Sequence, residues 1–152
     1  MPVLKELCTL TANVSALVDV GATPSGRRQI ADVKGGEVVG TRISGRVLPS
    51  GADWLLTGAD GIGRLDVRAT VETDDGAKIY VQYRGVLQLN ETVIEALSKG
   101  GETQFGDAYF MTTPHFETGH PDYAWLNAVV AVGQGRLLPG AVEYRIFEVC
   151  ND

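Results

Sequence analysis

Residues 65–89, LDVRATVETDDGAKIYVQYRGVLQL, decide the fold class of this 152-residue chain. Over residues 65–72 apolar side chains alternate with polar ones, and a period of two predicts a half-buried β-strand. An Asp-Asp-Gly sequence follows at residues 74–76, and these residue types tolerate the positive φ of a tight turn. Alternation then resumes over residues 79–84. The stretch therefore predicts an antiparallel β-hairpin.

Short apolar runs punctuated by glycine extend this pattern along the chain, with Gly35-Gly36 as one of the expected turns. Further strands are expected at residues 4–11, 14–20, 38–48, 53–57, 106–113, 125–134 and 141–149. One helix is expected after Asn90, which is a favourable N-cap residue, and it ends at Gly100-Gly101. Glycine thus separates most of the elements that we predict.

A sheet of this many strands, if left open, would expose two edges, and closure removes them. We therefore expect a mainly β fold, a single closed antiparallel β-barrel of about eight strands with one short helix, forming one domain over residues 1–152. A tightly closed sandwich is the alternative. A barrel of about eight strands holds either side chains only or one small ligand.

Charge and hydropathy exclude several classes of function. The net charge of −6 and the scattered arginines argue against a nucleic-acid partner, because phosphate binding requires clustered cations. No apolar run is long enough to span a membrane, and the N-terminus does not resemble a secretory signal, so we expect a cytoplasmic protein without a membrane partner. The two cysteines, Cys8 and Cys150, are expected to be reduced thiols.

The candidate catalytic residues are Asp53, Asp66 and Arg68. Alternation places Asp53 and Trp54 on opposite faces of a strand, and we expect Asp53 to point inward while Trp54 covers a seam outside. A buried carboxylate there would act as a general acid or base, whereas the alternative is a turn residue that bonds nearby amides. Asp66 and Arg68 either form a charged pair in the lumen or belong to a solvated outer face.

A second cluster, TPHFETGHPDYAWLN at residues 113–127, contains both histidines. Its spacing matches no standard zinc pattern, so no metal is expected. We interpret it as a binding loop in which Tyr123, Trp125 and Asn127 share one face on entering a strand, and the alternative is aromatic packing that closes the barrel end. The predicted ligand-binding residues are Trp54, His115, Tyr123, Trp125 and Asn127.

Three short motifs in order, GADW at 51–54, DDGAKIYV at 74–81 and WLN at 125–127, resemble the family called domain of unknown function 3237. The similarity spans roughly residues 20–149. The resemblance implies a β-barrel grouped with allene oxide cyclase-like and dirigent-like barrels, usually oligomeric. It implies no established activity.

Two functions remain open from the sequence, and whether the chain is an enzyme is uncertain. The first is an isomerase, cyclase, hydratase or lyase acting on a small, partly apolar molecule without a cofactor. In it Asp53 or Asp66 moves a proton and Arg68, Tyr123 or Asn127 steadies an oxyanion. The second is a non-catalytic, lipocalin-like binding protein, and a filled barrel that only assembles is a third reading. The expected partners are a small-molecule ligand and further copies of the chain.

Overall fold

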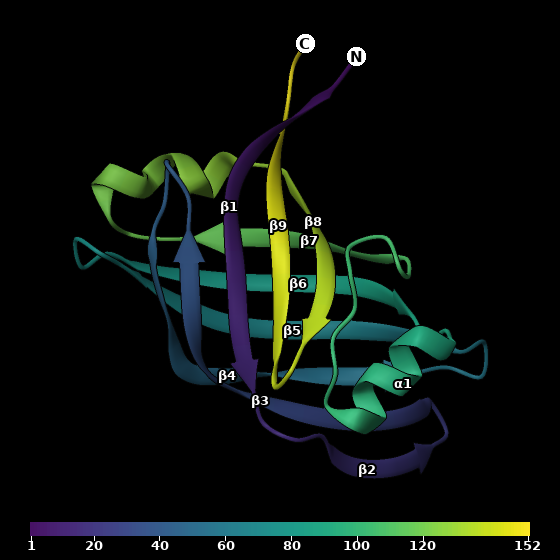
Figure 1. The fold of residues 1–152 in the computed structure, drawn as a ribbon. Helices are drawn as coiled ribbons and strands as arrows, with labels where there is room; N and C mark the ends of the chain where they lie inside the picture. The colour runs from purple at the N-terminus through teal and green to yellow at the C-terminus, as the bar shows by residue number, and fades with distance from the viewer.

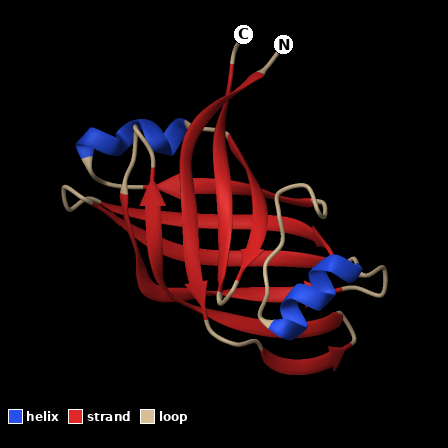
Figure 2. Cartoon of the chain, in the orientation of Figure 1, coloured by secondary structure: helices blue, strands red, loops and turns tan.

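The structure is a computed structural model that describes all residues from Met1 to Asp152. It contains nine strands and two short helices (Figure 1, Figure 2). The elements are β1 (Val3–Val14), β2 (Val18–Thr23), β3 (Gly26–Val39), β4 (Gly45–Thr57), β5 (Ile62–Thr73), β6 (Lys78–Gln88), α1 (Glu91–Lys99), β7 (Phe110–Glu117), the 3₁₀ helix η1 (Pro121–Ala128), β8 (Ala131–Leu138) and β9 (Ala141–Cys150).

The sheet closes because β1 pairs with two strands at once. It is antiparallel to β9 along most of its length and to β3 through Thr9–Val14. The sheet order β1-β9-β8-β7-β6-β5-β4-β3 is thereby joined end to end, and β2 adds one further strand beside β3. The predicted closed antiparallel barrel of eight strands is confirmed, with β2 and a second short helix, η1, in addition.

The hairpin of β5 and β6 has the predicted form. Its two strands pair continuously from Glu72 with Lys78 to Ile62 with Gln88. Gly76 lies in the connecting turn with φ of +91°, a conformation that glycine adopts without strain. The apolar side chains of both strands face the core, so the charged side chains of β5 face outward.

The longest strand, β3, was missed by sequence reasoning over most of its length. Gly35 and Gly36, expected to form a turn, lie inside it with φ of +139° and +143°, next to a shift of register against β4. A β-carbon on Gly36 would lie 1.9 Å from the carbonyl oxygen of Thr11. Gly36 therefore allows β1 to approach closely at the point where the barrel closes.

The two helices lie at opposite ends of the barrel, α1 at the lower right of Figure 1 and η1 at the upper left, near the β5–β6 turn. Helix α1 begins as predicted, since the Asn90 side chain accepts a hydrogen bond of 3.0 Å from the Val93 amide, and it ends at left-handed Gly100. Neither helix is long and apolar enough to cross a membrane.

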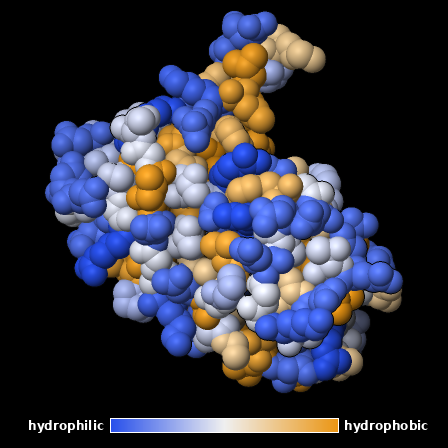
Figure 3. Space-filling view, in the orientation of Figure 1, coloured by the Kyte–Doolittle hydropathy of each residue, from blue (hydrophilic) through white to orange (hydrophobic).

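Residues 125–128 form the end of η1 rather than the start of a strand, which corrects the sequence prediction. Pro121 begins the helix, and the ring of His120 accepts a hydrogen bond from the Asp122 amide at the helix start. The surface seen in Figure 3 is mostly polar, with apolar side chains gathered where the chain ends project on β1 and β9.

Candidate functional site

A cavity of about 480 Å³ lies inside the barrel at the end covered by α1, and we call it the α1-end cavity. Of the 22 residues that line it, 17 are hydrophobic. The sheet contributes the walls, α1 contributes Ala96 and Leu97, and the segment between β1 and β2 adds residues 15–17. The cavity is therefore an apolar chamber walled mainly by the sheet.

Asp53 is the one charged residue that lines the α1-end cavity. It lies directly opposite Ala31 of β3 and Val67 of β5, both of which are buried and line the same cavity. Directly opposed residues of antiparallel strands point to one face of the sheet, so Asp53 points inward, as we expected. Trp54 consequently lies on the outer face.

A local break in the sheet positions the Asp53 carboxylate. The β4–β5 ladder pairs Asp53 with Val67 and resumes only at Leu56. In the break, the Asp66 amide donates to Oδ1 of Asp53 at 3.2 Å. The Arg28 guanidinium donates to the carbonyl oxygen of Trp54 at 2.8 Å. The hydrogen bond from the Asp66 amide is the one that the Asp53 carboxylate accepts, so Oδ2 has no partner in the protein and is available to a molecule in the cavity that Asp53 lines.

Burial raises the pKa of Asp53 from 3.8 to about 6. The hydrogen bond from the Asp66 amide opposes this rise, the Asp66 charge adds to it, and the Arg28 charge opposes it. A carboxyl group with a pKa near 6 can both accept and return a proton close to neutral pH. The side chain therefore has the ionisation expected of a general acid or base.

Two buried tyrosines lie within electrostatic reach of Asp53. Tyr144 of β9 lines the α1-end cavity, and the ring of Tyr83 of β6 meets it edge-on with 5.0 Å between centroids. Burial is the largest cause that raises the pKa of each phenol, and the Asp53 charge raises both further. Both hydroxyl groups thus stay protonated.

Neither tyrosine was singled out from the sequence. The sequence did indicate that Tyr83 points inward, because it alternates along β6 with Ile79 and Val81, which face the core. Tyr144 has the same kind of signal, because it alternates in phase with Val142 and Ile146, but only the closure of the barrel brings β9 opposite β4.

Asp66 and Arg68 do not reach the α1-end cavity, which corrects the prediction that they share its chemistry. The inward face of β5 is occupied by Leu65 and Val67, so the two charged side chains point outward. Arg68 lies over the outward-facing ring of Trp54, 5.7 Å from its centroid. Neither Arg68 nor Trp54 is therefore placed to touch a ligand in the cavity.

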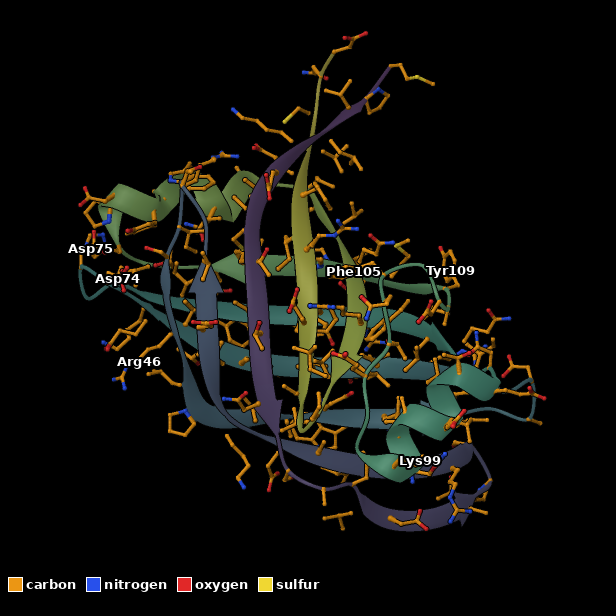
Figure 4. The ribbon with its side chains drawn as sticks, in the orientation of Figure 1. Arg46, Asp74, Asp75, Lys99, Phe105 and Tyr109 are labelled. Atoms are coloured by element: carbon orange, nitrogen blue, oxygen red, sulfur yellow. The ribbon has the colours of Figure 1, made fainter.

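The other predicted binding residues gather at the opposite end of the barrel, where η1 covers the core. Tyr123 donates to Asp75 in the β5–β6 turn at 2.9 Å, and Figure 4 shows Asp75 far from Lys99 of α1. Trp125 packs against the core beneath the Arg42 guanidinium, at 4.4 Å. This arrangement matches the alternative reading, aromatic packing that closes the barrel end.

His115 and Asn127 also lie away from the cavity. His115 is exposed on β7, and Asn127 bonds both the amide and the carbonyl group of Thr118. The predicted shared face of Tyr123, Trp125 and Asn127 is wrong, because a helix has replaced the expected strand.

No group of three or more His, Cys, Asp or Glu side chains is placed to hold a metal ion. Cys8 and Cys150 are both free thiols. Burial raises the pKa of the Cys8 thiol to about 12, so it carries little nucleophilic thiolate. Asp53 is thus the titrating group on which any chemistry in the cavity would depend.

The chain matches a family model described as "Protein of unknown function (DUF3237)" over residues 2–149. It is 38% identical over 129 residues to a UPF0311 protein of Rhodopseudomonas palustris, covering 85% of this chain and 84% of that protein. It is 32% identical over 146 residues to a UPF0311 protein of Clostridium acetobutylicum, covering 95% and 92%.

Solved structures share the whole fold. A conserved protein of unknown function from Rhodopseudomonas palustris is 34% identical, with a TM-score of 0.92 and 99% of each chain covered. An enzyme from Penicillium herquei is 23% identical, with a TM-score of 0.69 over 98% of this chain and 95% of that one, a likeness of fold alone.

Proposed function

This chain belongs to the DUF3237 family of proteins of unknown function, and we propose that it binds a small, largely apolar organic molecule in the α1-end cavity, where Asp53 exchanges a proton with it. One observation carries the proposal. The single charged side chain among mostly hydrophobic walls is a carboxylate whose pKa is raised to about 6. Perturbed titrating groups in clefts are typical of functional sites.

The dimensions and lining of the cavity define the class of ligand. A volume of about 480 Å³ lies within the usual range of small-molecule sites. Walls of Leu65, Val67 and Leu137 favour hydrocarbon or aromatic groups in the ligand. The ligand must also carry at least one proton that the free oxygen of Asp53 can bind or remove. We therefore expect an apolar ring or chain with one functional group.

The chemistry that Asp53 offers is proton transfer without a cofactor. Isomerisation, cyclisation, hydration and elimination all proceed by moving protons, and a base with a pKa near the working pH is effective in each. The Penicillium herquei enzyme shares this fold, so the barrel shape is compatible with catalysis.

A non-catalytic carrier, similar in use to a lipocalin, is the second candidate. The observation that favours it is the lining, of which 17 of 22 residues are hydrophobic. A carrier would bind its ligand equally well whether or not Asp53 can ionise, and this separates the two candidates.

Binding is tested with naphthalene and 2-acetylnaphthalene as probes, measured by calorimetry. Ala96→Phe directs a ring from α1 into the cavity, whereas Ile94→Phe enlarges an exposed position of the same helix and serves as the matched control. We expect both probes to bind the wild type and Ile94→Phe, and Ala96→Phe to bind at least about tenfold more weakly, a loss of about 1.4 kcal/mol. The proposed site would be contradicted if neither probe binds the wild type, or if Ala96→Phe binds the probes as tightly as the wild type does.

Proton transfer is tested in a cell extract prepared in D₂O. The wild type and Asp53→Asn are each added, and deuterium incorporation into small molecules is followed by mass spectrometry. The amide side chain of this variant would keep an acceptor oxygen for the Asp66 amide but has no basic group. An enzyme labels at least one compound that the variant does not label, and equal labelling by both proteins supports the carrier instead.

A further inference from the structure

We infer that Tyr144 donates a hydrogen bond to a carbonyl oxygen of the bound molecule while Asp53 removes a proton from the adjacent carbon, so that the substrate class is an apolar, enolisable ketone or ester. Tyr83 acts through Tyr144 as a positioning residue. This inference rests on the proposed function, since it requires a ligand in the α1-end cavity.

Asp53 and Tyr144 reach the same cavity from different strands, β4 and β9. The charge of Asp53 raises the pKa of Tyr144, which places the two groups within electrostatic reach of one another. Both side chains stand on sheet strands rather than loops, and rigid elements hold a reacting geometry well. A molecule in the cavity therefore meets a base and a hydroxyl donor together.

Tyr144 is the more available hydroxyl donor of the cavity. Ser15 is the other hydroxyl that lines it, but Ser15 donates to the Ala16 carbonyl at 3.1 Å and accepts from the Asp32 amide at 2.8 Å. The Tyr144 hydroxyl, in contrast, has only the neighbouring phenol of Tyr83 as a hydrogen-bond partner. A ligand carbonyl can compete with that phenol for the Tyr144 proton.

Packing fixes the ring of Tyr144 from two directions. Tyr83 meets it edge-on, and Phe110 of β7 does so with 5.5 Å between centroids. The Tyr83 and Tyr144 hydroxyls also interact, since each changes the pKa of the other. Such support orients the donor before the substrate arrives, which is the condition for effective oxyanion stabilisation.

The proposed step balances without an oxidant or a cofactor. The carbon–hydrogen bond next to the carbonyl breaks, and its proton moves to Oδ2 of Asp53. The electron pair forms a carbon–carbon double bond as the carbonyl oxygen becomes the enolate oxygen, which accepts the hydrogen bond of Tyr144. Return of the proton to the same carbon gives exchange, and return to a conjugated carbon gives an isomer. A carboxylate base facing neutral hydroxyl donors in an apolar site is suited to this chemistry.

The direct test is hydrogen–deuterium exchange of the methyl protons of 2-acetylnaphthalene in D₂O, followed by proton NMR. We expect the wild type to accelerate exchange with a pH midpoint of about 6, and Asp53→Asn to abolish the acceleration. Tyr144→Phe should slow exchange by about 100-fold, as removal of an oxyanion donor does, while probe affinity changes little. Tyr80→Phe, an outward-facing tyrosine of β6, is the matched control and should exchange like the wild type.

The carbonyl stretching band of the bound probe gives a second readout that a merely structural role would not move. A hydrogen bond from Tyr144 lowers its frequency relative to the probe in cyclohexane, and Tyr144→Phe should remove this shift. The wild-type spectrum alone decides the matter if the variant does not fold, because an unshifted band would overturn the inference.

The outcomes separate the inference from the proposal beneath it. If the probe does not bind the α1-end cavity, the proposed function fails. If the probe binds but its protons do not exchange faster than in buffer, or exchange equally fast in Tyr144→Phe, the inference fails while binding stands.

Discussion

The two ends of one barrel are built from the same strands but packed in opposite ways. On β6, Ile79 at the η1 end is completely buried among other core side chains, whereas Leu87 at the α1 end borders a cavity of about 480 Å³. On β5, Val71 belongs to the filled end and Val67 to the cavity wall. Both ends are capped by a short helix (Figure 1).

The difference lies in what the interior holds. The interior of the filled end consists of apolar side chains that pack against one another. Its helix, η1, is linked to the β5–β6 turn by the hydrogen bond from Tyr123 to Asp75. The cavity end carries the half-buried Asp53 carboxylate and the Tyr144 phenol, with the ring of Tyr83 packed against that phenol. The Asp53 carboxylate lies where the core is not filled with side chains, and the Tyr144 hydroxyl lies at the same end of the barrel.

The largest expected effect compares the two ends of β6. Ile79→Ala removes side-chain volume from a filled region, and we expect it to lower the free energy of unfolding by about 4 kcal/mol. Leu87→Ala enlarges a space that already exists, so fewer contacts are lost, and about half that cost is expected. Urea denaturation of the two variants measures both values, and equal losses would contradict the difference in packing.

A smaller effect concerns the pH dependence that Asp53 imposes on the cavity end. Its pKa of about 6 in the folded chain lies above the unfolded value of 3.8, so folding favours the protonated form. Stability from this group is fully present below pH 4 and is lost as pH rises to about 6, a total of about 3 kcal/mol. No such pH-dependent loss is expected from the interior of the filled end, which has no carboxylate.

Asp53→Asn should therefore be more stable than the wild type at pH 7.5, by up to about 3 kcal/mol, and nearly equal at pH 3.5. Asp53→Ala also removes the acceptor of the Asp66 amide, so at pH 3.5 it should be less stable than the wild type by about 1–3 kcal/mol. Thermal denaturation at both pH values checks the series. A wild type that is more stable than Asp53→Asn at pH 7.5 would show that the carboxylate is not destabilised by burial.

The next effect belongs to the η1 cap. Tyr123→Phe removes the hydrogen bond to Asp75, and because the carboxylate is exposed we expect a loss of about 1 kcal/mol or less. Probe binding at the α1-end cavity should not change. A weakened affinity for 2-acetylnaphthalene would mean that the η1 end contributes to the binding site after all.

The smallest effect is expected on the outer face of the barrel. Asp66→Asn alters a half-buried side chain on the outer face of β5, where one carboxylate oxygen is buried without a hydrogen-bond partner. Removing that charge should leave the protein equally stable or slightly more stable, and probe binding should not change. Paired with Asp53→Asn, this variant tests the direction of two carboxylates on neighbouring strands. The pH midpoint of exchange should fall slightly, because the Asp66 charge raises the pKa of Asp53. A loss of probe binding in Asp66→Asn would contradict the outward orientation.

The sequence predicted the features that depend on strict alternation. The β5–β6 hairpin and the placement of Asp53 and Trp54 on opposite faces of β4 follow from a period of two. The closed barrel follows from the need to remove two exposed sheet edges. Alternation did not decide which face of β5 was inside, and the charged face proved to be the outer one, as is usual for such faces.

Other features required the tertiary structure. The stretch entering residues 125–134 alternates like a strand, but Pro121 and the cap at His120 start a helix there. Asp53 and Tyr144 line the same cavity only because the barrel closes, since β4 and β9 are far apart in sequence. The homo-oligomer and the bound small molecule remain predictions.

The most direct test of the account is a carbon-13 NMR titration of the Asp53 carboxyl group, with and without 2-acetylnaphthalene. We expect a midpoint of about 6 in the free protein. With the probe bound we expect a higher midpoint, because the ligand removes water from the remaining carboxylate oxygen. A midpoint near 4 that the probe does not move would contradict a functional carboxylate inside the cavity.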